Sequence, residues 1–245
     1  MKYLVPAAAL LAAGIGAPAS AVVAFTEFGP LPQATFGGSG IPNDNVAITR
    51  ATVDGVEVTL GLSITQRYSN PAPGIISPGV YEVGPGTSIE GPNNLEGTLW
   101  NFNFYADVGS LDMSSGAYLL TLSYDFDPVS DNLGLIFLND FVGQDGIVQS
   151  SQNLLFGFLG ADADFVTVIP PFATDPGDPD GIQDFDPNAL GNYQFALQLD
   201  DLSGSTSVAI EAVVAQAEVV PAPAALGLLG LGVLGVGVMR RRRRG

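Results

Sequence analysis

The chain contains no histidine and no cysteine, and it has only 8 basic residues against 25 acidic ones. Without histidine, a Ser-His-Asp triad and imidazole metal ligands are excluded. Without cysteine, disulfides, thiolate nucleophiles and cysteine-held zinc or iron–sulfur centres are excluded. Long regular helices are also disfavoured, because 31 glycines and 18 prolines interrupt the 245 residues.

The few basic residues are concentrated at the two ends of the chain. Lys2 lies at the start and five arginines lie at the end, so that only Arg50 and Arg67 remain between them. Residues 22–219 hold these two cations and all 25 acidic residues, a formal charge of −23. Such a field repels phosphate backbones, and we expect no nucleic-acid partner for this region.

Residues 1–21 have the features of a secretory signal peptide. Lys2 provides the positive start, residues 4–15 are almost entirely apolar, and Ala19 and Ala21 form a small-x-small cleavage site. The alternative is a helix buried in the fold, which the prolines and the alanine-rich composition of this segment disfavour. We therefore expect a signal helix that is cleaved after Ala21.

The C-terminus has the pattern of a membrane anchor that stops translocation. Sixteen apolar residues, 224–239, precede a run of five arginines: Arg240, Arg241, Arg242, Arg243 and Arg244. As a helix, the apolar stretch spans roughly 24 Å. This is short for a hydrocarbon core of about 30 Å, but bilayer thinning and arginine snorkelling can close the gap. Because an arginine block is costly to translocate, we expect a transmembrane helix with a cytoplasmic end. The alternative of a basic nucleic-acid-binding tail is disfavoured by the apolar residues that precede it.

The last 26 residues resemble a known class of bacterial sorting signals. Val220, Pro221, Pro223 and Ala224, followed by the apolar stretch and the arginines, resemble the VPLPA-type variant of the PEP-CTERM signal. The resemblance implies export by the secretion machinery, then recognition and cleavage near the motif by an exosortase-type membrane transpeptidase. The expected organisation is a signal peptide at 1–21, one ectodomain at 22–219 and a sorting and anchor segment at 220–245.

The middle region is predicted to be all-β, as a single antiparallel β-sandwich or jelly-roll-like domain. Short alternating runs punctuated by glycine and proline indicate about nine strands, and Asp54-Gly55 indicates a hairpin turn. The segments 69–96 and 170–188 are predicted to be long loops. The predicted strands are 46–51, 56–63, 99–108, 117–125, 133–138, 153–159, 164–169, 192–199 and 207–215.

Part of the middle region also resembles exported PEP-CTERM proteins. Residues 149–158 (QSSQNLLFGF) and 185–195 (FDPNALGNYQF) are similar to a pattern common among those proteins. The resemblance implies that these residues introduce the last hairpin of a compact β-domain outside the cell.

The densest acidic cluster is a candidate Ca²⁺ loop. Carboxylates spaced around Gly181 suit an ion that takes six to eight oxygen ligands. The loop resembles the Asp-x-Asp-Gly-Ile-x-Asp loops of thrombospondin type 3 repeats, but it does not fit the EF-hand template. The alternative is a solvated acidic turn. The candidate ligands are Asp175, Asp178, Asp180, Asp184 and Asp186.

Two pairs of alternate aspartates are weaker candidates for glycosidase carboxylates. Asp125 and Asp127 follow a predicted strand, and Asp162 and Asp164 have the same spacing. The alternative, an exposed carboxylate at a strand end, is far commoner. The two consecutive aspartates Asp200 and Asp201 are expected to form a turn before Gly204.

The alternating aromatics Trp100, Phe102, Phe104 and Tyr105 are expected to lie in the core, with a sugar-stacking platform as the alternative. Arg50 and Arg67 are each expected to pair with carboxylates or to hold a surface together.

Three functional hypotheses follow from these observations. The first is an exported structural or adhesion-type protein of the cell surface or extracellular matrix, without catalytic activity. The second is a secreted module that binds calcium or extracellular polysaccharide. The third is a glycoside hydrolase that depends on paired carboxylates.

Overall fold

The structure is a computed structural model that describes residues 23–91, 93–128, 132–173, 178 and 180–216. The chain divides into two units, Met1–Ala215 and Gln216–Gly245. The predicted signal peptide, with Ala19 and Ala21, and the predicted sorting segment from Val220 to the arginines lie outside the described residues.

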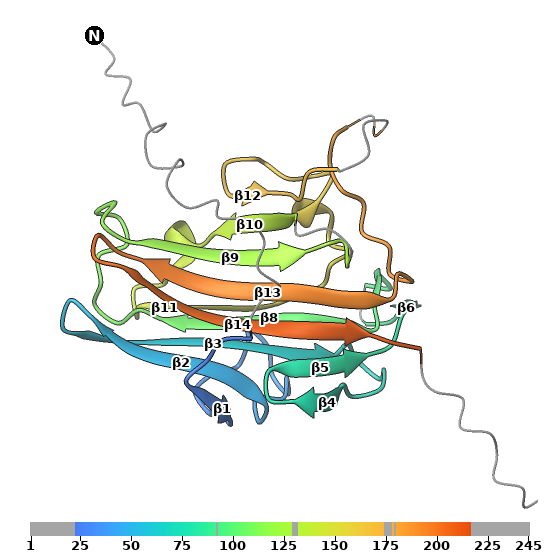
Figure 1. Cartoon of the computed structure of the whole chain (residues 1–245), viewed down its shortest axis with the longest axis horizontal. Coiled ribbons are helices and arrows are strands. Elements are labelled where there is room, and N and C mark those ends of the chain that lie inside the picture. The colour runs from blue at the N-terminus through green and yellow to red at the C-terminus, as the bar shows by residue number, and fades with distance from the viewer. Residues whose placement is uncertain (1–22, 92, 129–131, 174–177, 179, 217–245) are drawn as a thin grey trace, which may run out of the picture. The chain divides into compact units, whose positions relative to one another are not determined.

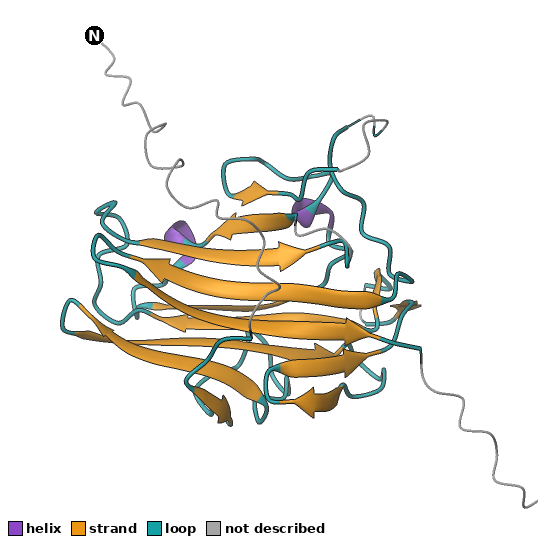
Figure 2. Cartoon of the chain, viewed as in Figure 1, coloured by secondary structure: helices purple, strands orange, loops and turns teal. Residues whose placement is uncertain are grey.

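The described residues form fourteen strands and two short 3₁₀-helices (Figure 1). Figure 2 shows that strands dominate the described chain, and the prediction of an all-β fold is confirmed. The elements are β1 Glu27–Gly29, β2 Val46–Val53, β3 Val56–Gln66, β4 Gly74–Ser77, β5 Val80–Val83, β6 Thr87–Ile89, β7 Glu96–Thr98, β8 Trp100–Asp107, β9 Leu119–Asp125, β10 Leu133–Phe137, η1 Asn139–Phe141, β11 Ile147–Gln152, η2 Gly157–Leu159, β12 Val168–Ile169, β13 Gly191–Asp200 and β14 Ser205–Val214.

The strands are organised in two large sheets and one small one. The five-stranded sheet has the order β1-β2-β3-β8-β11, and the seven-stranded sheet has the order β12-β10-β9-β13-β14-β5-β4. β6 and β7 form a separate two-stranded sheet. The pair β14–β5 is parallel, whereas the other strand pairs of the described residues are antiparallel.

One hydrophobic cluster contains inward-facing side chains of both large sheets. Trp100, Phe102 and Phe104 of β8 alternate into it and are at most 3% exposed. The ring of Phe102 stacks on Phe195 of β13 with centroids 4.8 Å apart, and Trp100 meets Phe195 edge-on. Burying a side chain of this size stabilises the fold by about 2 kcal/mol. The prediction that these aromatics belong to the core is confirmed.

A second cluster covers the opposite face of the five-stranded sheet. Tyr105 points away from its neighbours Phe104 and Ala106, because successive side chains of a strand face opposite sides. It packs with Leu31 and Phe36 of the segment that follows β1. Tyr105 is therefore also buried, but in a separate cluster.

Two turns agree with the sequence prediction. Asp54 and Gly55 have φ of 49° and 81°, both positive as a type I′ hairpin turn requires, and they join β2 to β3. Figure 1 shows β13 and β14 side by side as the last hairpin of the described chain. In its turn, the Asp201 carboxylate accepts hydrogen bonds from the backbone N–H groups of Ser203 and Gly204.

Two predicted strands are wrong, and in each an aspartate or asparagine explains why. In 153–159, the Asn153 side chain accepts the Leu155 N–H, and the chain turns and enters η2; the strand lies earlier, as β11. In 164–169, only Val168–Ile169 is a strand, because the Asp164 carboxylate accepts the backbone N–H groups of Val166, Thr167 and Val168. Such side-chain bonds compete with strand pairing.

The prediction of a long loop at 69–96 is also wrong. This segment contains β4, β5 and β6, and β7 starts at Glu96. These strands have only three or four residues each, and β5 pairs with the distant β14. In 170–188, by contrast, the described residues form only one bridge, between Phe172 and Ile182, which agrees with a loop.

Candidate functional site

The described carboxylates of the acidic loop close their own turns. The Asp178 carboxylate accepts the Asp180 N–H, and the Asp180 carboxylate accepts the Ile182 N–H at 3.0 Å. A hydrogen bond between the two carboxyl groups raises the pKa of Asp178, whereas the Ile182 N–H lowers the pKa of Asp180. The Asp186 carboxylate likewise accepts the Asn188 N–H.

This arrangement leaves the Ca²⁺ hypothesis a prediction. Asp175 lies outside the described residues. Within the described ranges, no three acidic, histidine or cysteine side chains form a group that could hold a metal. Asp184 is exposed, and its backbone carbonyl accepts the side-chain amide of Gln183.

Asp125 is not the exposed strand-end residue that the sequence suggested. It is 2% exposed, and its carboxylate accepts the backbone N–H of Asp127 at 3.0 Å. The short spacing between these two aspartates therefore builds the turn that follows β9.

The Asp164 carboxylate accepts three backbone N–H groups of the turn that leads into β12. Its Oδ1 accepts the N–H groups of Val166, Thr167 and Val168 at 3.0, 2.6 and 3.1 Å. These bonds, that from Thr167 first, lower the pKa of Asp164. The group is ionised at neutral pH, which suits a turn cap and does not suit a general acid.

Asp162 and Asp164 both line a cleft of about 650 Å³ between β11 and the β10–β12 edge. Its wall includes the core side chains Phe104, Ile136 and Val168, and Phe141 is 55% exposed at its rim. Asp145 lines the same cleft as Asp162 and Asp164, and no sequence pattern indicated that it would lie there. Phe158, 40% exposed, is the second exposed aromatic that lines this cleft, which we call the edge cleft.

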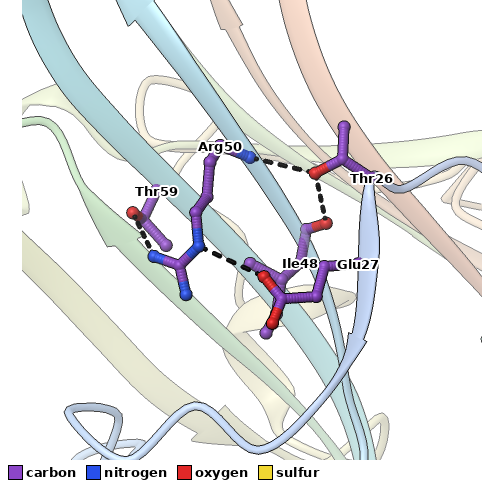
Figure 3. Close-up of polar contacts among 5 residues, drawn as sticks. All are labelled: Thr26, Glu27, Ile48, Arg50 and Thr59. Carbon is purple, nitrogen blue, oxygen red and sulfur yellow. Dashed lines mark hydrogen bonds and ion pairs between the residues drawn. The ribbon is translucent and has the colours of Figure 1, made fainter.

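Arg50 joins the first three strands of the five-stranded sheet (Figure 3). Its Nε lies 3.3 Å from Oε2 of Glu27, and its Nη1 donates to Thr59 Oγ1. Its backbone N–H donates to Thr26 Oγ1, which in turn donates to the Ile48 carbonyl. The predicted pairing with a carboxylate is confirmed, although both side chains are about half exposed and such a pair is worth roughly 0–1 kcal/mol.

Arg67 differs from the prediction, because its guanidinium is buried and binds backbone carbonyls. The residue is 5% exposed and donates to the carbonyls of Ser88, Glu90 and Leu95 at 2.8, 3.4 and 2.5 Å. Gly97 makes room for it, because a Cβ there would lie 2.8 Å from the guanidinium carbon. The sole ion pair of the described residues is the one between Arg50 and Glu27. Arg67 instead ties the β6–β7 hairpin to the end of β3.

Arg67 and Tyr68 are among the residues that line a second cleft, of about 490 Å³. Tyr68 is 54% exposed and has φ of +53°, a conformation that bulky residues rarely adopt. Asn70 closes the turn, since its N–H and its side-chain amide both donate to the Arg67 carbonyl. We call this the Tyr68 cleft; sequence reasoning missed it because its walls come from segments far apart in the chain.

The Tyr68 cleft has a polar floor on the outer face of the five-stranded sheet. Thr65 of β3, Asn101 of β8 and Ser151 of β11 line it. The Asn101 side-chain amide donates to Ser151 Oγ at 3.1 Å and its oxygen accepts the Asn153 amide at 2.7 Å. Hydroxyl and amide groups that both donate and accept are thus held in place by a hydrogen-bond network.

Glu90 also lines the Tyr68 cleft, where its carboxylate offsets the positive charge of Arg67. Its Oε2 accepts the hydroxyl and the N–H of Ser69, which lower the pKa of Glu90, and the charge of Arg67 acts in the same direction. The carboxylate is therefore ionised at neutral pH.

No family model, no curated protein and no solved structure matches this chain. A search of the described ranges for helices with the length and apolarity needed to span a membrane finds none. Any statement about function therefore depends on the residues themselves.

Proposed function

We propose that the protein is an exported structural or adhesion-type component of the cell surface or extracellular matrix, without catalytic activity. In this proposal, residues 1–21 are a signal helix removed after Ala21. Residues 224–239 are a transmembrane helix that holds the β-domain outside until an exosortase-type enzyme acts at the Val220–Ala224 motif. The secretion machinery and this enzyme are the partners, and the membrane is engaged through the C-terminal helix.

The two ends of the sequence support the location. An apolar segment behind Lys2 and an apolar segment before five arginines give consistent orientations, with the acidic middle outside and the arginines inside. The charge distribution agrees with this orientation. Apart from Arg50 and Arg67, the basic residues lie at the two ends, and residues 22–219 carry a formal charge of −23.

The observation that carries the non-catalytic role is the use that the domain makes of its carboxylates. Asp112 and Asp201 each accept a serine hydroxyl and backbone N–H groups of their own turns, and these bonds, the hydroxyl first, lower their pKa. Asp164 accepts backbone N–H groups of its own turn, that of Thr167 first, and these bonds lower its pKa. A general acid at neutral pH needs a raised pKa in a water-excluding pocket. Carboxylates kept ionised on exposed turns instead give a soluble, strongly acidic surface.

Export is tested by fractionating bacteria that express the full-length chain. We expect a mature protein that begins at Val22, recovered with the membrane or outside the cell and sensitive to protease added to intact cells. Full-length protein in the soluble cytoplasm, with its signal peptide intact, would contradict the proposal.

The arginine run is tested with two matched variants. Replacing Arg240–Arg244 by glycine removes the stop signal, and we expect the protein to leave the membrane fraction. Replacing the same five residues by lysine keeps the charge, and we expect membrane retention. Equal behaviour of the two variants would show that positive charge is not what holds the tail.

The catalytic alternative has a direct test. Turnover of a glycoside substrate by the purified chain, lost on Asp125→Asn or Asp162→Asn, would replace the structural role by a hydrolase.

A further inference from the structure

The Tyr68 cleft contains an aromatic ring whose position is set in advance. The ring lies against the α-carbon of Gly91, where an added Cβ would overlap it, and the Arg67 guanidinium carbon lies 5.0 Å from its centroid. The backbone carbonyl of Tyr68 also accepts the side-chain amide of Gln66 at 3.1 Å. An exposed ring held by these contacts loses little freedom when a ligand packs on it.

The backbone conformation at Tyr68 adds to this argument. A bulky residue with positive φ is strained, and such strain persists only where the surrounding contacts impose it. In this conformation the ring is exposed in the wall of the cleft instead of buried in the core. Trp100, Phe102 and Phe104 cannot take this role, because they are buried between the sheets.

The floor of the cleft matches hydroxyl groups. Thr65, Asn101 and Ser151 supply hydroxyl and amide groups, and sugar hydroxyls likewise both donate and accept hydrogen bonds. The C–H face of a sugar ring packs on an aromatic face such as that of Tyr68. The cleft volume of about 490 Å³ lies within the roughly 300–1,000 Å³ of small-molecule sites.

Charge selects the kind of sugar. Three N–H groups of the Arg67 guanidinium are occupied by backbone carbonyls, and the Glu90 carboxylate offsets its charge. The domain as a whole repels anions, since residues 22–219 carry a formal charge of −23. A neutral chain therefore fits this cleft better than an acidic polysaccharide.

We propose that the Tyr68 cleft binds a neutral polysaccharide, with the Tyr68 ring stacking on one sugar unit and the Thr65–Asn101–Ser151 floor bonding its hydroxyls. This proposal deepens the proposed function by naming a matrix partner. It rests on that function in one respect, because the domain must be exported to meet an extracellular polysaccharide. Binding by the purified chain is measured without export, so the two proposals can fail separately.

The test is an array of immobilised neutral glucans, xylans, mannans and galactans, with alginate and heparin as acidic comparators, probed with the full-length chain in detergent. We expect binding to at least one neutral glycan. A tenfold loss of affinity, about what removal of one stacking ring produces, is expected for Tyr68→Ala. Tyr68→Phe keeps the ring and should bind more tightly than Tyr68→Ala.

Two further variants separate loss of the ring from loss of the fold. Tyr68→Gly relieves the positive φ and removes the ring, so we expect lost binding without a lower melting temperature. Phe141→Ala removes an equally exposed aromatic from the edge cleft and should leave binding unchanged. Binding only to the acidic comparators, no binding to any neutral glycan, or a loss with Phe141→Ala but not with Tyr68→Ala would each overturn the proposal.

Discussion

The ring of Tyr68 lies so close to the α-carbon of Gly91 that no side chain larger than hydrogen fits between them. Gly91 also has φ of +97°, a conformation that favours glycine. Gly91 thus meets two requirements. It adopts the positive φ of the turn before β7, and it leaves room for the Tyr68 ring that lies against its α-carbon.

Gly91→Ala is expected to displace the Tyr68 ring and to destabilise the domain by about 2 kcal/mol, measured by urea denaturation. Glycan binding should fall with it. The matched control is Gly86→Ala, because Gly86 has φ of +106° but open space where the Cβ would lie. Equal destabilisation by the two variants would show that the ring contact contributes nothing.

Arg67→Met is expected to destabilise the domain by about 3 kcal/mol, because three backbone carbonyls lose a buried, charged donor. Arg50→Met, at an exposed ion pair, should cost no more than about 1 kcal/mol. Both values come from denaturation midpoints of the full-length chain. A cost for Arg67→Met as small as that for Arg50→Met would contradict the role assigned to this guanidinium.

Stability is expected to fall in acid because hydrogen bonds within their own turns hold the folded-state pKa values of Asp112, Asp164 and Asp201 below the ordinary value of an aspartate. For a depressed pKa, the stabilisation is fully present above the unfolded-state value and is lost as the pH falls through the folded-state value. Thermal melts from neutral pH down to pH values below the ordinary pKa of an aspartate measure this loss of stability.

Asp164→Asn keeps an oxygen acceptor but removes the charge, so the variant should be less stable at neutral pH and converge with the parent in acid. The control Asp44→Asn removes one charge from another exposed acid. An Asp164→Asn melting curve that runs parallel to the parent at every pH would contradict the assignment.

Ca²⁺ at tenfold excess over its dissociation constant is expected to stabilise the domain by roughly 1.4 kcal/mol if the acidic loop binds it. Melting curves with Ca²⁺ and with EDTA give this difference. The combined change Asp178→Asn and Asp180→Asn should abolish it, whereas Asp125→Asn should not. The same shift in the loop variant would place Ca²⁺ elsewhere or show a general effect of ionic strength.

The local features predicted from sequence are those whose causes are local. Asp54-Gly55 forms a type I′ turn because these two residue types tolerate positive φ. The core placement of Trp100 and Phe102 follows from strict alternation along one strand. The strand predictions at 153–159 and 164–169 are wrong because Asn153 and Asp164 close turns with their own side chains, which apolar patterning does not register.

The sequence by itself excluded histidine- and cysteine-dependent chemistry, because those residue types are absent. It also determined the all-β class and the long central strands, because these depend on side chains that alternate with a period of two along the chain. Only the tertiary structure decided that β5 pairs in parallel with β14 and that Arg67 is buried among carbonyls. It also decided that Tyr68, Asn101 and Ser151 meet at one cleft. These arrangements join segments far apart in the chain, and the free energy of long-range packing that selects them leaves no local pattern in the residues that take part.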